Sequence, residues 1–516
     1  MNGAESIVKS LTAAGIDRCF ANPGTSEMHF LAALDRVGGI DCSLCLFEGV
    51  VTGAADGYAR MAGKPALTLL HCGPGLANGL ANLHNAKRAR TPMLNIVGDH
   101  ARDHVRFNTP LTSDVVNIAR PFSDWVRKID RPEDIARDVS EAIAASSGPK
   151  GGIATLVLPT DLAWGPGPAP LSSAPQVPGL DPVADEVIAE AAAIIERGEP
   201  VLIFATGPAL SEAGTRALGR LASLAHVEYL APVNGPRYDR GAGRVDIARI
   251  PYDPGLARAR IGHIKHILLV GTDEPASFFA YPDTPGSVVP EGCTLHRFSE
   301  AGMDAVAGLE ALADRLGTGA TAYRVTERIE TARPSGAITP TSLAAAIAAT
   351  LPEHAIICDE GLTQGREVMP ATTHGPPHSW VQITGGAIGN GLPLALGAAM
   401  GARDRRVVSV QADGSGLFTL QALWSQAREG LDVTTVILAN QSYEILKGEM
   451  ANIGVPTPGP LAQDMMSLQN PAIDWLALSK GFGVPAARAE DAETLMQLLE
   501  QSYATPGPFL IEARIG

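Results

Sequence analysis

Short runs of β-forming residues alternate with helical segments along most of the chain, and this alternation restricts the fold more than any other feature. The first third contains the runs "IDRCF", "SLCLF", "ALTLL" and "MLNIV", and the last third contains "AIIC", "VVSVQ", "TTVILA" and "FLIEA". Strands that alternate with helices form parallel sheets covered by helices on both faces. The sequence therefore predicts an α/β protein with doubly wound parallel sheets.

Two segments rich in proline, glycine and serine interrupt the alternation and predict domain boundaries. They are "GPGPAPLSSAPQVPG", residues 165–179, and "TARPSGAITPTS", residues 331–342, and neither has an apolar period. We expect three domains, at residues 1–165, 180–330 and 338–516. The last should open with Thr339 as a helix N-cap and Pro340 in the first helical turn.

Charge and composition argue against several classes of protein. The formal net charge is −15, without the clustered lysines and arginines that hold a nucleic acid backbone, so nucleic acid is not an expected partner. The longest uncharged stretch, residues 369–402, contains Pro393 and many glycines, so no membrane span is expected. Six scattered cysteines and an N-terminus without a signal-peptide pattern favour the cytoplasm.

A strand, an acid and two glycines follow one another in "VVSVQADGSG", residues 407–416. Asp413 ends this strand and Asn440 ends the next one, "TTVILA", so we expect their side chains at neighbouring strand ends, about 4.8 Å apart. Two oxygen ligands at this spacing, with the carbonyl of Ser442 as a third, predict a Mg²⁺ site. The backbone amides that can approach a phosphate there belong to Gly414, Ser415 and Gly416.

Asp-Gly-Ser alone is ordinary turn chemistry, and the pairing with Asn440 makes the pattern specific. Together these residues resemble the thiamine-diphosphate signature, in which Asp-Gly is followed after one βα unit by an Asn. Two positions depart from it, because Ala412 stands where the family usually has Gly and Ala439 where it often has Asn. The proposed ligating atoms are intact.

The first domain resembles the pyrimidine domain of the acetolactate synthase and benzoylformate decarboxylase family. The resemblance rests on "FANPGTSEMHFLAALD", "FEGVVTGAADGYAR" and "LLHCGPGLANGLANLHNAKRARTPML"; it resumes in the third domain and is weaker in the middle. It implies pyrimidine-binding, central and diphosphate-binding domains, with thiamine diphosphate and Mg²⁺ as cofactors.

The family builds each site from two subunits, which implies a homodimer at minimum and favours a homotetramer. Some relatives hold FAD in the central domain, but the short central domain here has no fingerprint for it, so FAD is not predicted.

Catalysis with thiamine diphosphate requires an acid beside the pyrimidine ring, and Glu48 fits this role. It directly follows the run "SLCLF", at a strand end where sites form. In apolar surroundings its carboxyl would have a raised pKa and could carry a proton near neutral pH. The alternative is that Glu48 only caps a helix that begins at Val50, and the resemblance favours the catalytic role.

The third domain contains two further segments similar to the family. "TGGAIGNGLPLALGAAMG", residues 384–401, matches the segment whose bulky apolar residue props the cofactor into a bent shape, which would be Ile388 beside Gly386. A buried core isoleucine is the alternative. "EGLTQG", from Glu360, matches a loop near the diphosphate and makes Thr363 and Gln364 candidate contacts.

The resemblance implies attack on a 2-oxo acid, loss of CO₂ and an enamine that is either protonated or added to a second carbonyl. Thr25 and His71 match a pocket hydroxyl and a proton-relaying histidine of benzoylformate decarboxylase-like enzymes, so simple decarboxylation is preferred over acetolactate synthase-like carboligation. The second pocket histidine of those enzymes is not found, because the comparable stretch offers Phe278, Phe279 and Tyr281. His100 and His104 are expected to be solvated loop residues.

Two other classes remain as alternatives. A nicotinamide oxidoreductase would require a G-x-G-x-x-G after a strand and an acid about 20 residues further on. The nearest match, "GGAIGNG", is expected to follow no strand and lacks that acid. A non-catalytic cofactor-binding subunit would not need the proton donor Glu48.

Overall fold

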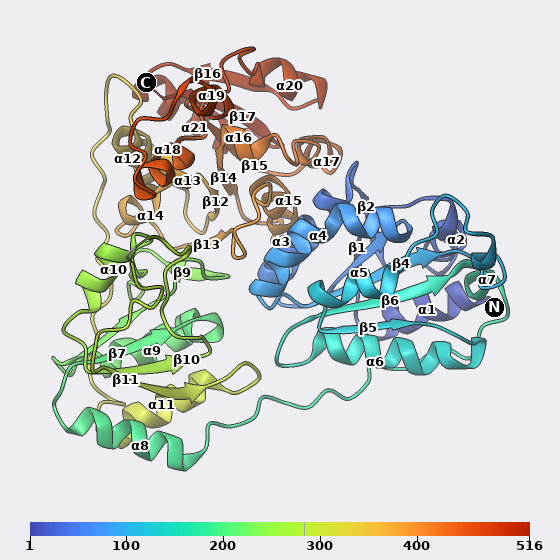
Figure 1. Cartoon of the computed structure of the whole chain (residues 1–516), viewed down its shortest axis with the longest axis horizontal. Helices are drawn as coiled ribbons and strands as arrows, with labels where there is room; N and C mark the ends of the chain where they lie inside the picture. Colours follow the sequence, from blue (N-terminus) through green and yellow to red (C-terminus); the bar gives the residue numbers. More distant parts are fainter. Residues whose placement is uncertain (283, 516) are drawn as a thin grey trace.

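The computed structural model describes residues 1–282 and 284–515, and its strands form three sheets (Figure 1). In Figure 1 the first domain is blue to cyan, the central domain is green to yellow and the third is orange to red. The predicted class of doubly wound parallel sheets is confirmed, whereas the residues at which the domains begin and end stay predictions. Within the described ranges, no helix is both long enough and apolar enough to cross a bilayer.

The first sheet has six parallel strands in the order β2-β1-β3-β4-β6-β5. The strands are β1 (Arg18–Asn22), β2 (Asp41–Leu44), β3 (Ala66–Leu70), β4 (Met93–Asp99), β5 (Trp125–Lys128) and β6 (Ile153–Pro159). The helices are α1 (Gly3–Ala13), α2 (Met28–Val37), α3 (Glu48–Ala62), α4 (Cys72–Arg88), α5 (Val115–Ala119), α6 (Ile135–Ser147) and α7 (Thr160–Trp164). The central strands β3, β4 and β6 are buried along their whole length, because helices cover both faces.

The central domain has four parallel strands in the order β11-β10-β7-β8. These are β7 (Val201–Ala205), β8 (Val227–Leu230), β10 (His266–Val270) and β11 (Thr294–Ser299). The helices are α8 (Asp185–Glu196), α9 (Glu212–Leu221), α10 (Pro254–Ile261) and α11 (Ala305–Arg315). The β-forming runs "PVLIFATG" and "HILLVGT" contain β7 and β10, which lie in the middle of this sheet.

The third sheet has seven strands in the order β16-β17-β15-β14-β12-β13-β9. They are β9 (Tyr238–Arg240), β12 (Ile356–Glu360), β13 (His378–Gln382), β14 (Val407–Ala412), β15 (Val433–Ala439), β16 (Ala486–Ala489) and β17 (Phe509–Arg514). The helices are α12 (Pro340–Thr350), α13 (Leu362–Gly365), α14 (Val368–Ala371), α15 (Gly391–Gly401), α16 (Asp413–Gly416), α17 (Ala422–Arg428), α18 (Glu444–Asn452), α19 (Pro460–Met465), α20 (Trp475–Gly481) and α21 (Ala492–Ala504). As predicted, Thr339 caps α12 and Pro340 lies in its first turn.

Strand β9 departs from the sequence-based division of the chain. It comes from the segment assigned to the central domain, yet it pairs antiparallel with β13 at the edge of the third sheet. Its Tyr238 and Arg240 are buried, because they lie where the two domains meet. The central and third domains therefore share one apolar core.

Helices α3 and α15 join the first and third domains of the same chain (Figure 1). A Cβ added at Gly57 would lie 2.1 Å from the carbonyl oxygen of Leu394, and one added at Gly397 would lie 1.8 Å from that of Ala54. The two backbones are thus in direct contact, and only glycine fits at these two positions. This packing fixes how the first domain faces the loop that precedes α15.

Candidate active site

A cavity of about 900 Å³ opens at the carboxyl ends of β12, β14 and β15 in the third sheet. Ligands of parallel sheets gather at this edge. The central domain contributes another wall, which includes Tyr252, Phe278 and Phe279. Of the third-domain residues predicted to bind a cofactor or metal, Gly416 does not line this cavity, whereas the others do: Thr363, Gln364, Gly386, Ile388, Asp413, Gly414, Ser415, Asn440 and Ser442.

Asp413 and Asn440 lie at the ends of neighbouring strands, as their spacing predicts. Strands β14 and β15 pair in parallel. The Asp413 carboxylate accepts the N–H of Gln441 at 2.6 Å and that of Gly414 at 2.8 Å. The side-chain oxygen of Asn440 accepts the N–H of Ser442 at 3.2 Å. The contact from Asp413 to Gln441 joins the two strand ends and holds the candidate ligands at one edge.

The Asp413 carboxyl is buried, with 2% of the residue exposed. Burial raises the pKa of Asp413 to about 6, although backbone amides stabilise its charged form. No positively charged side chain is among the groups that stabilise this charge. A carboxylate, an amide oxygen and a backbone carbonyl at one strand edge form a donor set that Mg²⁺ accepts, so these residues fit the predicted ion.

Two further features of the cavity wall point to a bound ligand. The hydroxyl of Thr363 is buried and has no hydrogen-bond partner in the described part of the chain, and unpaired buried groups are rare in proteins. Leu362 and Gln441 adopt left-handed backbone conformations, with φ of 47° and 54°. Such strain concentrates at binding sites. Leu362 directly precedes Thr363, and Gln441 lies between Asn440 and Ser442, so both strained residues adjoin candidate binding residues in sequence.

The turn after β14 differs in detail from its expected form. A single helical turn, α16, already begins at Asp413, and the apolar helix α17 begins only at Ala422. Gly414 lies under the ring of Tyr443, where an added Cβ would come within 2.5 Å of a ring carbon. The Ser415 hydroxyl accepts a hydrogen bond from Gln411 at 2.6 Å and donates its own proton to the carbonyl oxygen of Ala412 at 3.2 Å. Ser415 can therefore offer a phosphate its backbone amide more readily than its hydroxyl.

Ile388 is half-buried and lines the cavity, so it is not an ordinary core residue. Its loop has left-handed glycines on both sides, Gly386 with φ of 77° and Gly389 with φ of 90°. These conformations turn the chain sharply and leave the Ile388 side chain at the cavity wall. This placement is compatible with the propping role that the resemblance implies.

The expectation that no strand precedes "GGAIGNG" is wrong. Strand β13 ends at Gln382, shortly before this segment, and was missed because "HSWVQ" is short and follows two prolines. The segment nevertheless does not offer its amides to a dinucleotide. The carboxylate of Glu360, which is 1% exposed, accepts the N–H groups of Gly389 at 2.7 Å and Gly391 at 2.7 Å. The amides of Gly389 and Gly391 are thus occupied within the protein and are not available to the phosphates of a dinucleotide.

In the first domain, Glu48 is the first residue of α3 and is 7% exposed. Its carboxylate accepts hydrogen bonds from the amide groups of Asn22 at 3.2 Å and Asn78 at 3.0 Å. These partners come from β1 and α4, not from the backbone amides of its own helix. The contacts therefore favour a role in a site over a capping role, although the surroundings are more polar than the sequence predicts.

His71 lies beside Glu48 along the same strand edge and forms a hydrogen-bonded pair with Glu27, a partner that the sequence patterns did not indicate. Its Nδ1 lies 2.7 Å from Oε2 of Glu27, and the peptide of Gly24 packs against its ring. Burial raises the pKa of Glu27 although His71 lowers it. Thr25 is exposed and is two residues from Glu27 in the same 3₁₀ turn. Glu27 lies three residues after Gly24, which is the spacing of a capping box. This spacing was the one sequence signal that could have indicated a structural position for Glu27.

The structure does not bring the two halves of the predicted site together within one chain. Glu48, His71 and Thr25 form one group at the first sheet, and none of them lines the cavity of the third sheet. His104 is exposed and His100 is half-buried, and the ring of His100 lies 3.3 Å from the Thr109 hydroxyl. These two histidines form a separate loop cluster.

The wall that the central domain contributes to the cavity carries aromatic rings. Phe278 contacts Phe279 and Tyr252, with ring centroids 4.9 and 5.7 Å away. The hydroxyl of Tyr281 donates to Glu449 on α18 at 2.8 Å. Tyr252 and Glu449 were not foreseen, because only the approach of the central domain to α18 makes them cavity residues.

Comparison with known proteins gives two family matches. The profile described as "Thiamine pyrophosphate enzyme, N-terminal TPP binding domain" matches residues 1–118. The one described as "Thiamine pyrophosphate enzyme, C-terminal TPP binding domain" matches residues 365–513. These ranges contain the two groups of candidate residues, apart from Thr363 and Gln364.

Similar proteins extend over the whole chain. The "Putative acetolactate synthase large subunit IlvX" of Mycobacterium tuberculosis is 45% identical over 514 residues, which cover 99% of this chain and 98% of the relative. A benzoylformate decarboxylase of Pseudomonas aeruginosa is 29% identical over 529 residues, covering 96% of each chain. The solved structure of a 4-hydroxybenzoylformate decarboxylase from Rhodococcus jostii superposes with a TM-score of 0.87 at 24% identity, covering 100% of this chain and 99% of that one. At this identity, the superposition shows the shared fold.

Proposed function

The chain belongs to the thiamine pyrophosphate enzymes, and on this basis we propose that it is an acetolactate synthase-like carboligase. In this proposal it decarboxylates a 2-oxo acid with thiamine diphosphate and Mg²⁺ and joins the remaining fragment to a second carbonyl compound. The main support for the reaction is the 45% identity to the acetolactate synthase-like relative along nearly all of both chains.

The third domain would hold the diphosphate and the metal. Asp413, Asn440 and the carbonyl of Ser442 would ligate Mg²⁺, and Thr363 would donate its unpaired hydroxyl to the ligand. Ile388 would support the cofactor between its two rings. When bound, thiamine diphosphate supplies the nucleophilic carbon and the electron sink that decarboxylation requires.

The first domain would supply the proton-transfer groups. Glu48 would hold a proton at the pyrimidine ring, kept in place by the amides of Asn22 and Asn78. His71 would exchange a proton with the substrate, while Glu27 holds Nδ1 and leaves Nε2 for that exchange. A carboxylate that orients one nitrogen of a histidine is a common arrangement in acid–base catalysis.

A decarboxylase that releases an aldehyde is the second candidate, favoured by the His71–Glu27 pair. From the sequence alone, Thr25 and His71 favour this reaction over carboligation. The relative of higher identity supports carboligation better than decarboxylation, whereas the benzoylformate decarboxylase is 29% identical. Carboligation therefore replaces decarboxylation as the leading proposal.

We further propose that the complete site forms between two copies of the chain. The groups at the first and third sheets do not share a cavity within one chain, so Glu48 of one copy would face the cavity of another. A homodimer is then the smallest active form, and a homotetramer would combine two such dimers.

The test is to incubate the protein, thiamine diphosphate and Mg²⁺ with pyruvate, benzoylformate or a branched 2-oxo acid. CO₂, aldehyde and acetolactate-type products are measured separately. Carboligation predicts CO₂ with a joined 2-hydroxy-ketone product and little free aldehyde. Release of aldehyde alone would support the second candidate, and cofactor binding without CO₂ from any of these acids would contradict both.

A further inference from the structure

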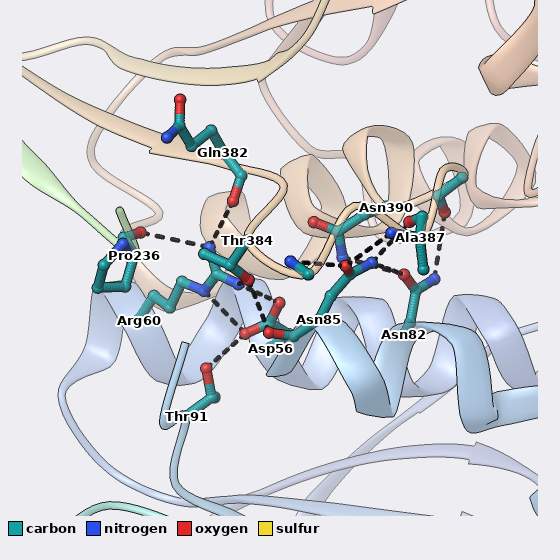
Figure 2. Close-up of polar contacts among 12 residues, drawn as sticks. Asp56, Arg60, Asn82, Asn85, Thr91, Pro236, Gln382, Thr384, Ala387 and Asn390 are labelled. Carbon is teal, nitrogen blue, oxygen red and sulfur yellow. Dashed lines mark hydrogen bonds and ion pairs between the residues drawn. The ribbon is translucent and has the colours of Figure 1, made fainter. Parts of the chain in front are cut away.

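The loop that contains Ile388 has no regular secondary structure to satisfy its backbone. It runs from the end of β13 to the start of α15 and turns at the left-handed Gly386 and Gly389. Buried backbone N–H and C=O groups require hydrogen-bond partners. In this loop, side chains from other parts of the molecule provide them (Figure 2).

Asn85, on α4 of the first domain, holds the centre of the loop. Its Nδ2 donates to the carbonyl oxygen of Ala387 at 2.7 Å, and its Oδ1 accepts the N–H groups of Gly385 at 3.0 Å and Ala387 at 3.3 Å. The side-chain amide thus bonds both polar groups of Ala387, the residue directly before Ile388. Only an amide side chain offers a donor and an acceptor on one plane in this way.

Asn82, one turn earlier on α4, holds the end of the loop. Its Nδ2 donates to the carbonyl oxygen of Gly389 at 3.1 Å, and its Oδ1 accepts from the side chains of Asn390 at 3.1 Å and Asn85 at 2.9 Å. Asn82 is 2% exposed and Asn85 is fully buried. Figure 2 shows both side chains pointing from α4 into the loop.

The start of the loop is held by a buried ion pair of α3. Arg60 pairs with Asp56 at 2.6 Å and donates to the carbonyl oxygen of Gln382 at 2.7 Å and to the hydroxyl of Thr384 at 3.1 Å (Figure 2). The Thr384 hydroxyl donates in turn to the carbonyl oxygen of Asn85 at 2.6 Å. The first domain therefore contacts the loop at its start, centre and end.

We propose that Asn82 and Asn85 are positioning residues for Ile388, so that the first domain shapes the cofactor site in the third domain of its own chain. The same helix also reaches Glu48 through Asn78. Helix α4 would then contact both the propping loop and the proposed ring acid. The role of Ile388 toward the cofactor rests on the proposed function, whereas the anchoring of the loop does not.

The test measures amide hydrogen exchange in the cofactor-free, full-length protein. In Asn85→Ala, the amides of Gly385 and Ala387 should exchange about 10-fold faster or more, because the hydrogen bonds that they donate to Asn85 are lost, whereas the amides of Gly389 and Gly391 stay bonded to Glu360. The affinity for thiamine diphosphate with Mg²⁺, measured by calorimetry, should fall about 10-fold, as for other groups that orient a ligand site. Asn85→Asp keeps an acceptor for the N–H groups of Gly385 and Ala387 but cannot donate to the carbonyl oxygen of Ala387, so its effect on exchange should be smaller than that of Asn85→Ala.

Leu83→Ala is the matched control, because Leu83 is a fully buried apolar residue of the same helix. It should lower thermal stability while loop exchange stays close to that of the unmodified protein. Thr384→Val removes the two hydroxyl contacts of Thr384, with Arg60 and with Asn85, and provides a milder variant if Asn85→Ala fails to fold. It should still raise exchange at the start of the loop.

Unchanged loop exchange in Asn85→Ala or, if that variant fails to fold, in Thr384→Val would overturn the proposal, as would equal increases in Leu83→Ala and Asn85→Ala. If the unmodified protein does not bind thiamine diphosphate, the proposed function fails, and the exchange result still tests the anchoring.

Discussion

The first and third sheets both end in polar residues at the carboxyl edges of their parallel strands, but these residues have different surroundings. At the first sheet, Glu48 accepts from two asparagine amides and His71 pairs with Glu27. At the third sheet, Asp413 is held by backbone amides beside a cavity of about 900 Å³. At the first sheet, the polar side chains are hydrogen-bonded to other side chains. At the third sheet, the candidate ligands present oxygen atoms to an open cavity.

This difference shows that one architecture can support two kinds of chemistry. A proton donor must be oriented by neighbours that do not neutralise it, and the amide groups around Glu48 suit its proposed role in this way. A metal ligand needs an unneutralised negative charge and room for the ion, and burial without a cation suits Asp413 to its proposed role. Each prediction below changes one edge and leaves the other in place.

Glu48→Gln should have the largest effect on activity. Turnover is expected to fall by about 10²–10⁴-fold, the typical contribution of one positioned acid or base. Cofactor affinity should change little, because the cavity of the third sheet is intact. Turnover is measured as CO₂ release and affinity by calorimetry, and an equal loss in both would contradict the division of roles.

Asp413→Ala should act through binding. The affinity for thiamine diphosphate in the presence of Mg²⁺ is expected to fall by about 100-fold or more, since groups one step further from a metal already contribute 10–100-fold. Asp404→Ala, which removes an exposed acid of the same domain, is the control and should bind normally. Calorimetry with and without Mg²⁺ makes the comparison, and tight binding by Asp413→Ala would disprove the metal site.

Mixing the inactive variants Glu48→Gln and Asp413→Ala tests whether the two edges meet between chains. After subunit exchange, about half of the dimers are mixed, and one of the two sites in each has both residues intact, so activity should return to about a quarter of the original. Each variant incubated alone is the control. No recovery despite confirmed exchange would place both edges in a site within one chain.

The smallest effect concerns the stability of the metal-free protein. Burial raises the pKa of Asp413 from 3.8 to about 6, so the folded state is destabilised by the ionised carboxylate above pH 6. This penalty decreases as the pH falls through 6 and vanishes below 3.8. Asp413→Asn should therefore melt roughly 1–3 °C higher than the unmodified protein at pH 8 with EDTA, and the difference should shrink by pH 5. A lower melting temperature at pH 8 would contradict this.

Local sequence patterns were sufficient to predict a residue's position where that position depends only on its neighbours in sequence. Asp413, Asn440 and Glu48 each directly follow a recognisable β run, and parallel strands place such residues at one edge. Thr339 and Pro340 are likewise local helix signals. The structure placed the three third-domain ligand candidates, Asp413, Asn440 and Ser442, in one cavity.

Contacts between distant segments could not be foreseen in the same way. Asn85 contacts Ala387 and Arg60 contacts Gln382 across about 300 residues of sequence, and no pattern within α4 or α3 indicates these partners. Strand β9 was missed because three residues give too short an alternation to recognise, and its pairing depends on the free edge of β13.

The sequence by itself determined the alternation of strands and helices and the chemical type of the residues at the predicted strand ends, because hydrophobic periodicity and turn residues act over a few positions. The tertiary structure alone decided which residues share the cavity, which amides hold the Ile388 loop and why Glu48 lies apart from Asp413 in one chain. These outcomes depend on how the domains pack. That packing includes close backbone contacts such as Gly57 with Leu394, which a side chain at Gly57 would prevent. The sequence around Gly57 does not show that Leu394 lies against it.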